Sequence, residues 1–182
     1  MWGNVSYILP LSSSFPLILC RPPGRIIFQK SYANENFSSF KAALQHFISE
    51  SGIKRPPLTA CFAVAGPVTN NSVSFTNRDS WSIEGDDIAK TFGIKVVKLV
   101  NDFVAVGYGL LTLTEETECR VLQSAPKVRG APIACIGAGT GLGECFLTVG
   151  PNGHYVCYPT EGGHTEFAPR SPVNISCPQY DL

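Results

Sequence analysis

The chain of 182 residues is long enough for one ordinary domain, or for one domain and part of another. Its 14 basic and 14 acidic residues cancel, and the lack of a basic surplus counts against a nucleic-acid protein. The hydrophobic share of 44% counts against disorder, and no uninterrupted apolar run reaches the roughly 18 residues of a membrane span. We therefore expect a globular protein that acts on small molecules, without a nucleic-acid or membrane partner.

The seven cysteines form neither a zinc pattern nor a disulfide framework, because their number is odd and no two are spaced Cys-x-x-Cys. Four of them stand inside apolar, strand-like runs: Cys61, Cys135, Cys145 and Cys157. We interpret these four as small buried hydrophobes of a protein in a reducing compartment. A cytoplasmic location and no metal site are expected.

Both ends of the chain differ in character from its middle. The apolar run over residues 7–19 is broken by two prolines and three serines, and the first basic residue, Arg21, follows it. This order fits neither a signal peptide nor a transit peptide. The stretch from Pro169 to Leu182 is rich in proline and has no periodicity, so we expect an irregular tail there.

The first half of the chain predicts alternating strands and helices. Residues 25–32 predict a strand. Apolar residues then recur at three- and four-residue steps, which predicts a helix over 37–50, with Asn36 or Ser38 as its N-cap and Gly52 at its end. The continuous apolar run Leu58–Ala65 is typical of a buried central strand. Further elements follow: a strand over 72–76, a helix over 83–92 ended by Gly93, a strand over 96–100 and a helix over 103–111.

The second half predicts strands around a glycine-rich loop. The expected strands cover 132–136, 145–149 and 155–158. Four glycines in the loop 137–143 could expose backbone N–H groups to phosphate oxygens. The loop lacks the dinucleotide fingerprint, because Leu142 stands where the third glycine belongs, and it leads into a strand rather than a helix. It suits the phosphate loop of an actin-like ATPase, and a plain hairpin turn is an equal alternative.

Two further patterns place polar side chains after strands. Asn101 and Asp102 stand where a predicted strand meets a predicted helix, at the kind of sheet edge where ligands bind. The helix N-terminus would keep Asp102 ionised as a proton acceptor, although Asn and Asp are also the preferred N-caps. Glu161 and His164 flank two glycines that could bring backbone close to a ligand, and both side chains could hold sugar hydroxyls.

Taken together, the order and spacing of these patterns resemble the bacterial-type glucokinases of the hexokinase and actin-like superfamily. The resemblance runs from about Leu17 to Pro169 and rests on five stretches: Leu58–Pro67, Ser74–Trp81, Leu99–Val106, Ile136–Gly143 and Pro159–Pro169.

The resemblance implies ATP-dependent phosphorylation of the 6-hydroxyl of glucose, with ATP and Mg²⁺ bound by the family. By that likeness Asp102 is the general base, and Asn101, Glu161 and His164 hydrogen-bond the other hydroxyls. Thr76 and Asn77 border the same pocket. The second phosphate loop would consist of Gly139, Thr140 and Gly141.

The chain also departs from the family pattern. The family opens with a phosphate loop Asp-x-Gly-Gly-Thr-Asn, which aligns with Leu9–Ser14, so that the aspartate and both glycines are replaced. After Pro169 the likeness stops, and a further sugar-binding glutamate and the adenosine-binding region are not found. These departures count against binding of ATP and Mg²⁺ by this chain.

The fold expected from the resemblance is the α/β actin-like ATPase (ribonuclease H-like) fold, with most of the small domain and the start of the large one. Residues 1–16 would be a divergent N-terminal segment, 17–112 the small sugar-binding domain and 113–182 a truncated part of the large domain. Three functions stay open: an incomplete copy of a glucokinase, a catalytically dead sugar-binding or regulatory fragment, and an actin-like kinase for another hexose.

Overall fold

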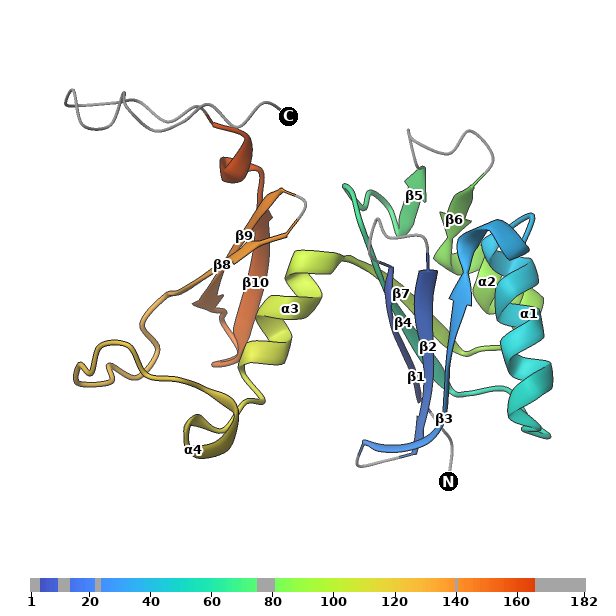
Figure 1. The fold of residues 1–182 in the computed structure, drawn as a ribbon, viewed down its shortest axis with the longest axis horizontal. Coiled ribbons are helices and arrows are strands. Elements are labelled where there is room, and N and C mark those ends of the chain that lie inside the picture. The colour runs from blue at the N-terminus through green and yellow to red at the C-terminus, as the bar shows by residue number, and fades with distance from the viewer. Residues whose placement is uncertain (1–3, 10–13, 22–23, 75–80, 140, 166–182) are drawn as a thin grey trace.

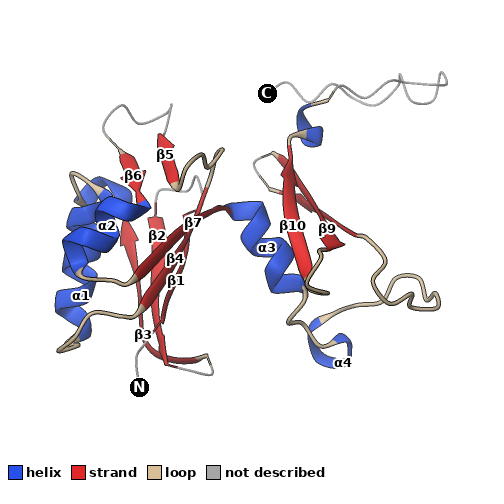
Figure 2. Cartoon of the chain, turned by 180° about the vertical axis from the view of Figure 1, so that it is seen from behind, coloured by secondary structure: helices blue, strands red, loops and turns tan. Residues whose placement is uncertain are grey.

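The chain folds into two groups of elements joined by one helix, in a computed structural model that describes residues 4–9, 14–21, 24–74, 81–139 and 141–165 (Figure 1). The first group is a five-stranded sheet with helices on one face. The second is a three-stranded antiparallel sheet. The joining helix, α3 (Asp102–Leu110), lies between the two sheets in both ribbon views (Figure 2).

The five-stranded sheet has the order β3-β2-β1-β4-β7 and mixes both pairing senses. Its strands are β1 (Asn4–Leu9), β2 (Ser14–Arg21), β3 (Arg25–Ala33), β4 (Thr59–Val64) and β7 (Val96–Asn101). β1, β4 and β7 are parallel, whereas β2 and β3 run antiparallel to their neighbours. The sequence pattern predicted no strand in residues 4–9, yet β1 is the middle strand. The predicted buried strand, β4, is interior as expected.

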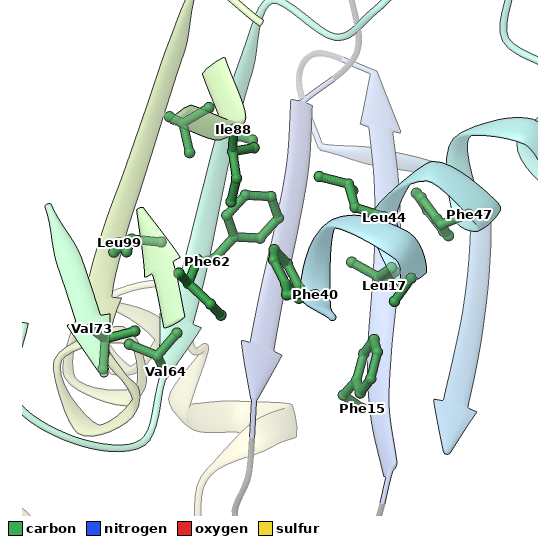
Figure 3. Packing of buried hydrophobic residues seen from close by; sticks show 14 of the residues in the cluster. Phe15, Leu17, Phe40, Leu44, Phe47, Phe62, Val64, Val73, Ile88 and Leu99 are labelled. Atoms are coloured by element: carbon green, nitrogen blue, oxygen red, sulfur yellow. The ribbon is translucent and has the colours of Figure 1, made fainter. Parts of the chain in front are cut away.

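One face of this sheet carries the main hydrophobic core. Along β2 the side chains of Phe15, Leu17 and Leu19 are buried, and the alternate positions are not, as the two-residue period of a strand requires. The helices α1 (Phe40–Ser51) and α2 (Gly85–Phe92) cover that face. Figure 3 shows Phe40, Leu44 and Phe47 of α1 directed toward the β2 side chains.

The ends of α1 follow capping chemistry. Ser39 is the N-cap, since its side chain accepts a hydrogen bond from the Ala42 N–H at 3.2 Å. The two expected caps, Asn36 and Ser38, were therefore wrong by one to three positions; Asn36 belongs to a short 3₁₀ helix, η1 (Asn34–Asn36). Gly52 ends the helix with a φ of 65°, a left-handed conformation that favours glycine, as predicted.

The predicted helix over 83–92 is shorter than expected because its start is a strand. β6 (Ser82–Glu84) pairs with β5 (Ser72–Ser74), and α2 begins only at Gly85. Asn71 fixes this arrangement: its side-chain Oδ1 accepts from the Leu99 N–H at 2.8 Å, and its Nδ2 donates to the Val97 carbonyl at 3.0 Å. These two bonds tie the β5 turn to β7.

The second sheet has the order β10-β9-β8 and packs on α3. Its strands are β8 (Ile133–Ala138), β9 (Leu142–Val149) and β10 (Tyr155–Thr160), and a short helix, α4 (Glu115–Glu118), precedes them. Gly107 permits the close packing, because a Cβ there would lie 2.6 Å from the Cys157 sulfur and 2.8 Å from the Cys145 sulfur.

The cysteine predictions are confirmed at three positions and wrong at one. Cys135, Cys145 and Cys157 are buried between α3 and the second sheet, and burial raises the pKa of Cys145 to about 11. Cys61 is exposed, because Ala60 and Phe62 on either side of it point into the main core and a strand alternates its faces. Within the described ranges, no helix is long and apolar enough to cross a membrane.

Candidate functional site

The junction of β7 and α3 places Asn101 and Asp102 at the carboxyl end of a parallel strand. Asn101 is the N-cap of α3: its Oδ1 accepts from the Phe103 N–H at 2.9 Å and from the Val104 N–H at 3.3 Å. Its Nδ2 donates to the Gly66 carbonyl at 3.3 Å. Asn101 is therefore the N-cap residue, and Asp102 is the first residue of α3.

Asp102 is a half-buried carboxylate whose proton affinity is increased. Burial raises its pKa, hydrogen bonding from the Phe103 N–H lowers it, and the charge of Glu161 raises it again. The net direction is upward, opposite to what the helix N-terminus alone predicted, because removal from water outweighs the helix dipole. A carboxylate with a raised pKa is a stronger proton acceptor, so the position suits a general base.

Glu161 follows the end of β10 and is the N-cap of a short 3₁₀ helix, η2 (Gly162–His164), of which His164 is the last residue. Their side chains are 76% and 83% exposed, and His164 Nε2 lies 3.5 Å from Glu161 Oε2. Glu161 is close enough to Asp102 for its charge to act on that carboxyl. The structure thus brings Asn101, Asp102 and Glu161 to one region, with His164 beside Glu161.

The glycines between Glu161 and His164 pack closely against β9. A Cβ at Gly163 would lie 1.9 Å from the Leu142 carbonyl oxygen, and one at Gly162 would lie 2.3 Å from a carboxylate oxygen of Glu144. η2 therefore rests directly on β9, and no side chain larger than hydrogen fits at 163 without moving backbone.

The glycine-rich loop is a tight connection between β8 and β9. Ala138 pairs with Leu142, and the Gly139 N–H donates to the Gly141 carbonyl at 2.9 Å. Neither Gly139 nor Gly141 is among the glycines with a left-handed φ, and a Cβ at either would have no atom closer than 3.9 Å. These two glycines face open space, as a surface that meets a ligand must.

The other two glycines of the loop accommodate Phe103, which the sequence analysis did not single out. A Cβ at Gly143 would lie 1.9 Å from the Phe103 ring, and one at Gly137 would lie 2.7 Å from it. Gly137 and Gly143 pair across the hairpin, so together they form a surface without side chains against which the ring packs. Phe103 follows Asp102 directly, and its ring fixes the start of α3 against the glycine hairpin. Two glycines placed symmetrically about a hairpin loop are the sequence pattern that could have predicted a ring packed against the hairpin.

Three expected site residues lie outside the described residues: Thr76, Asn77 and Thr140. Asp102 does not line either of two cavities, of about 570 and 220 Å³, that described residues form. The larger one is at the opposite end of the five-stranded sheet, away from the carboxyl ends of its parallel strands.

The described residues do not supply a magnesium site of their own. The family's first phosphate loop would place an aspartate where Leu9 stands. Among the residues that the structure describes, no group of three or more His, Cys, Asp or Glu side chains could hold a metal ion. Mg²⁺ in kinases is usually held by one or two carboxylates together with substrate phosphates, and Leu9 stands where the family's loop would supply one such carboxylate.

Comparison with known proteins identifies glucokinases among the relatives of this chain. The chain is 40% identical over 158 residues to a glucokinase of Synechocystis, which covers 85% of this chain and 44% of that protein. It is 40% identical over 156 residues to a glucokinase of Trichormus variabilis, which covers 86% of this chain and 45% of that protein. The chain thus spans about half the length of the curated relatives it matches.

A solved structure has the same fold. The crystal structure of a glucokinase from an Antarctic psychrotroph superposes with a TM-score of 0.82 at 22% identity, over 96% of this chain and 55% of that one. A family model for glucokinases matches residues 14–180, so the likeness continues beyond Pro169, where the sequence patterns ended it. With the match extending over most of its length, the chain belongs to the glucokinase family.

Proposed function

We propose that this chain carries the sugar side of an ATP-dependent glucose kinase, with Asp102 as the general base. The observation that carries the proposal is the position of Asp102: a half-buried carboxylate with a raised pKa at the carboxyl end of a parallel strand, next to the N-cap Asn101. The proposal rests also on the 40% identity to glucokinases.

In this mechanism the sugar is held by side chains around Asp102. Glu161 accepts and His164 donates or accepts hydrogen bonds to the hydroxyls, for which their exposed side chains are available. Asn101 contributes its second amide hydrogen, since its Oδ1 already accepts two backbone bonds and its Nδ2 already donates to Gly66. Thr76 and Asn77 complete the border of the pocket.

The chemical step is a proton transfer coupled to phosphoryl transfer. Asp102 takes the proton of the 6-hydroxyl as that oxygen bonds to the γ-phosphorus of ATP, and ADP leaves with the electrons of the broken P–O bond. Gly139, Thr140 and Gly141 face the phosphates. The Gly139 N–H already donates to Gly141, so the remaining N–H groups of the loop are the ones offered to phosphate. ATP with Mg²⁺ supplies charge compensation in kinases generally.

A catalytically dead sugar-binding fragment is the second candidate. Leu9 in place of the aspartate of the first phosphate loop favours it. Both candidates predict that the chain binds a hexose at Glu161. A kinase for another hexose is distinguished from them by competition between glucose, mannose and N-acetylmannosamine for that binding.

Calorimetric titration of glucose into the chain tests hexose binding at Glu161, which both candidates predict. We expect saturable binding that Glu161→Gln weakens about tenfold, since a hydrogen bond to a charged group is worth about 1.5–3 kcal/mol. Glu84→Gln is the matched control, because Glu84 is exposed and its side chain does not cap α2. Equal affinities for all three proteins would remove Glu161 from the site.

We propose with this function the domain division stated above, an actin-like arrangement of the two sheets and a cytoplasmic location. The main core ends at Leu99, and Val100 and Val104 pack in the second cluster, which supports two separate cores with a change at the junction of β7 and α3, somewhat before the proposed boundary at 112. The described cysteines are free thiols, which supports a reducing compartment.

A further inference from the structure

The short helix η2 is held together by hydrogen bonds of its own. The Gly162 N–H donates to Thr160 Oγ1 at 2.8 Å, and the Thr165 N–H and hydroxyl donate to the Gly162 carbonyl at 3.0 and 2.6 Å. The His164 N–H donates to the Glu161 carbonyl at 3.1 Å. These bonds make η2 a unit, so its position as a whole sets the positions of the Glu161 and His164 side chains.

The two glycines of η2 are in contact with different kinds of atoms. A Cβ at Gly163 would collide with the backbone carbonyl group of Leu142, whereas the nearest atoms to a Cβ at Gly162 are side-chain atoms of Glu144 and Thr160. Neither glycine is among those with a left-handed φ, so the space around them, and not backbone conformation, distinguishes them. A carboxylate at the end of a flexible side chain can rotate away from an added methyl group. A strand carbonyl cannot.

η2 lies on the face of the second sheet that is opposite α3, at the end where β9 begins (Figure 1). Glu144, which η2 contacts, alternates along β9 with Cys145, and the Cys145 side chain is buried against α3. A displacement of η2 away from β9 would therefore carry Glu161 farther from α3 and from Asp102, the first residue of α3.

We propose that Gly163 is a positioning residue of the sugar site: its close contact with the Leu142 carbonyl lets η2 rest on β9 and so holds Glu161 beside Asp102. Because Leu142 directly follows the glycine-rich loop, the same contact joins that loop to the proposed sugar-binding residues. The role assigned to Glu161 and Asp102 rests on the proposed function, whereas the position of η2 does not.

Titration of the Asp102 carboxyl group by NMR, in the 182-residue chain, measures the position of Glu161 without any sugar. The charge of Glu161 raises the pKa of Asp102, so Glu161→Gln should lower that pKa. Gly163→Ala should cause most of the same fall, because the methyl group lifts η2 from β9. Gly162→Ala is the matched control: it adds the same methyl group one residue away, and the pKa of Asp102 should stay in place because the Glu144 carboxylate moves aside.

Calorimetric titration of glucose gives a second readout of the same variants. We expect Gly163→Ala to weaken glucose binding about tenfold, as Glu161→Gln does, and Gly162→Ala to keep it within about twofold of the parent chain. Circular dichroism verifies that each variant is folded. If Gly163→Ala is not, Glu161→Asp carries the test, since it withdraws the carboxylate by one methylene without an added atom at 163 and should also lower the pKa of Asp102.

Several results would overturn the proposal. They are an unchanged pKa of Asp102 in Gly163→Ala, equal falls in the two glycine variants, an unchanged pKa in Glu161→Gln or Glu161→Asp, and full glucose affinity in Gly163→Ala. Absence of glucose binding by the parent chain would instead overturn the proposed function, and the titration of Asp102 would still decide the role of Gly163.

Discussion

At the scale of single residues, Asn101 and Asp102 are neighbours of which either residue type could be the N-cap of α3. Asn101 caps α3 through two backbone N–H groups, and Asp102 is left with a raised pKa. From the sequence both residues were equally credible caps. Only the backbone geometry, with Asn101 extended at φ −63° and ψ 148°, shows which residue precedes the helix.

This division predicts the outcome of Asp102→Asn. In a chimera that restores Asp-x-Gly-Gly-Thr-Asn over 9–14 and adds the remaining half of the Synechocystis relative, we expect kcat to fall by about 10²–10⁴, the usual contribution of a positioned base. Glucose affinity should change little. Steady-state kinetics and calorimetry measure the two effects, and a kcat within about threefold of the parent would exclude Asp102 as the base.

The same substitution has a pH-dependent effect on stability with a definite sign. Because the folded-state pKa of Asp102 is raised above that of the unfolded chain, its protonated form is favoured by folding. Its contribution to stability is present below the unfolded pKa of about 3.9 and is lost as the pH rises through the folded value. At pH 7 Asp102→Asn should therefore melt at the same temperature as the parent chain or higher, and the gain should vanish near pH 3. Melting curves at both pH values check this.

Phe103 and Gly143 offer a prediction about positioning. Gly143→Ala places a methyl group 1.9 Å from the Phe103 ring, so the ring must move. We expect a destabilisation of about 1–3 kcal/mol, as for other overpacked sites, and a lower kcat in the chimera because the start of α3 moves. Gly141→Ala is the control, since no atom lies within 4 Å of a Cβ there and its effect should stay within about 0.5 kcal/mol.

The double substitution Gly143→Ala, Phe103→Ala separates the causes. If the clash with the ring is responsible, the second substitution should remove most of the additional cost of the first in urea unfolding. Additive costs would show that Gly143 is required for another reason.

At the scale of elements, the cap of α1 gives a prediction that distinguishes three neighbouring residues. Ser39→Ala should cost about 1 kcal/mol, because the Ala42 N–H loses its side-chain acceptor. Ser38→Ala and Asn36→Ala, the caps expected from the sequence, should cost clearly less. Urea denaturation of the three variants measures the differences, and an equal cost for Ser38→Ala would contradict the assignment of Ser39.

The sequence predicted those helices and strands whose positions are set by residues within the element itself. The strands β3, β4 and β7 and the helix α3 were predicted to within two residues, because hydrophobic period and glycine stops act locally. β1 was missed since prolines and serines follow it directly, and β6 was missed because three residues carry no period. Phe103 was missed because its partners, Gly137 and Gly143, are distant in sequence.

At the scale of the whole molecule, the chain holds one side of the candidate reaction and spans less than half of the Synechocystis relative. We expect no glucose phosphorylation by the 182-residue chain alone, because Leu9 replaces the aspartate of the first phosphate loop. A coupled assay with glucose and ATP measures this, with the chimera as positive control. Turnover by the chain well above the enzyme-free rate would show that the loop aspartate is dispensable.

The central place of β1 has a consequence for how this sheet can be taken apart. β1 pairs with β2 on one side and β4 on the other, so removal of residues 1–9 leaves two strand edges facing an empty slot in the middle of the sheet. Unpaired edges accept extended peptides by strand addition. A chain begun at residue 10 should therefore be rescued by the free peptide NVSYIL supplied in trans. The domain would then be a split protein whose assembly is set by peptide concentration, and without the peptide the slot would recruit a strand from another copy.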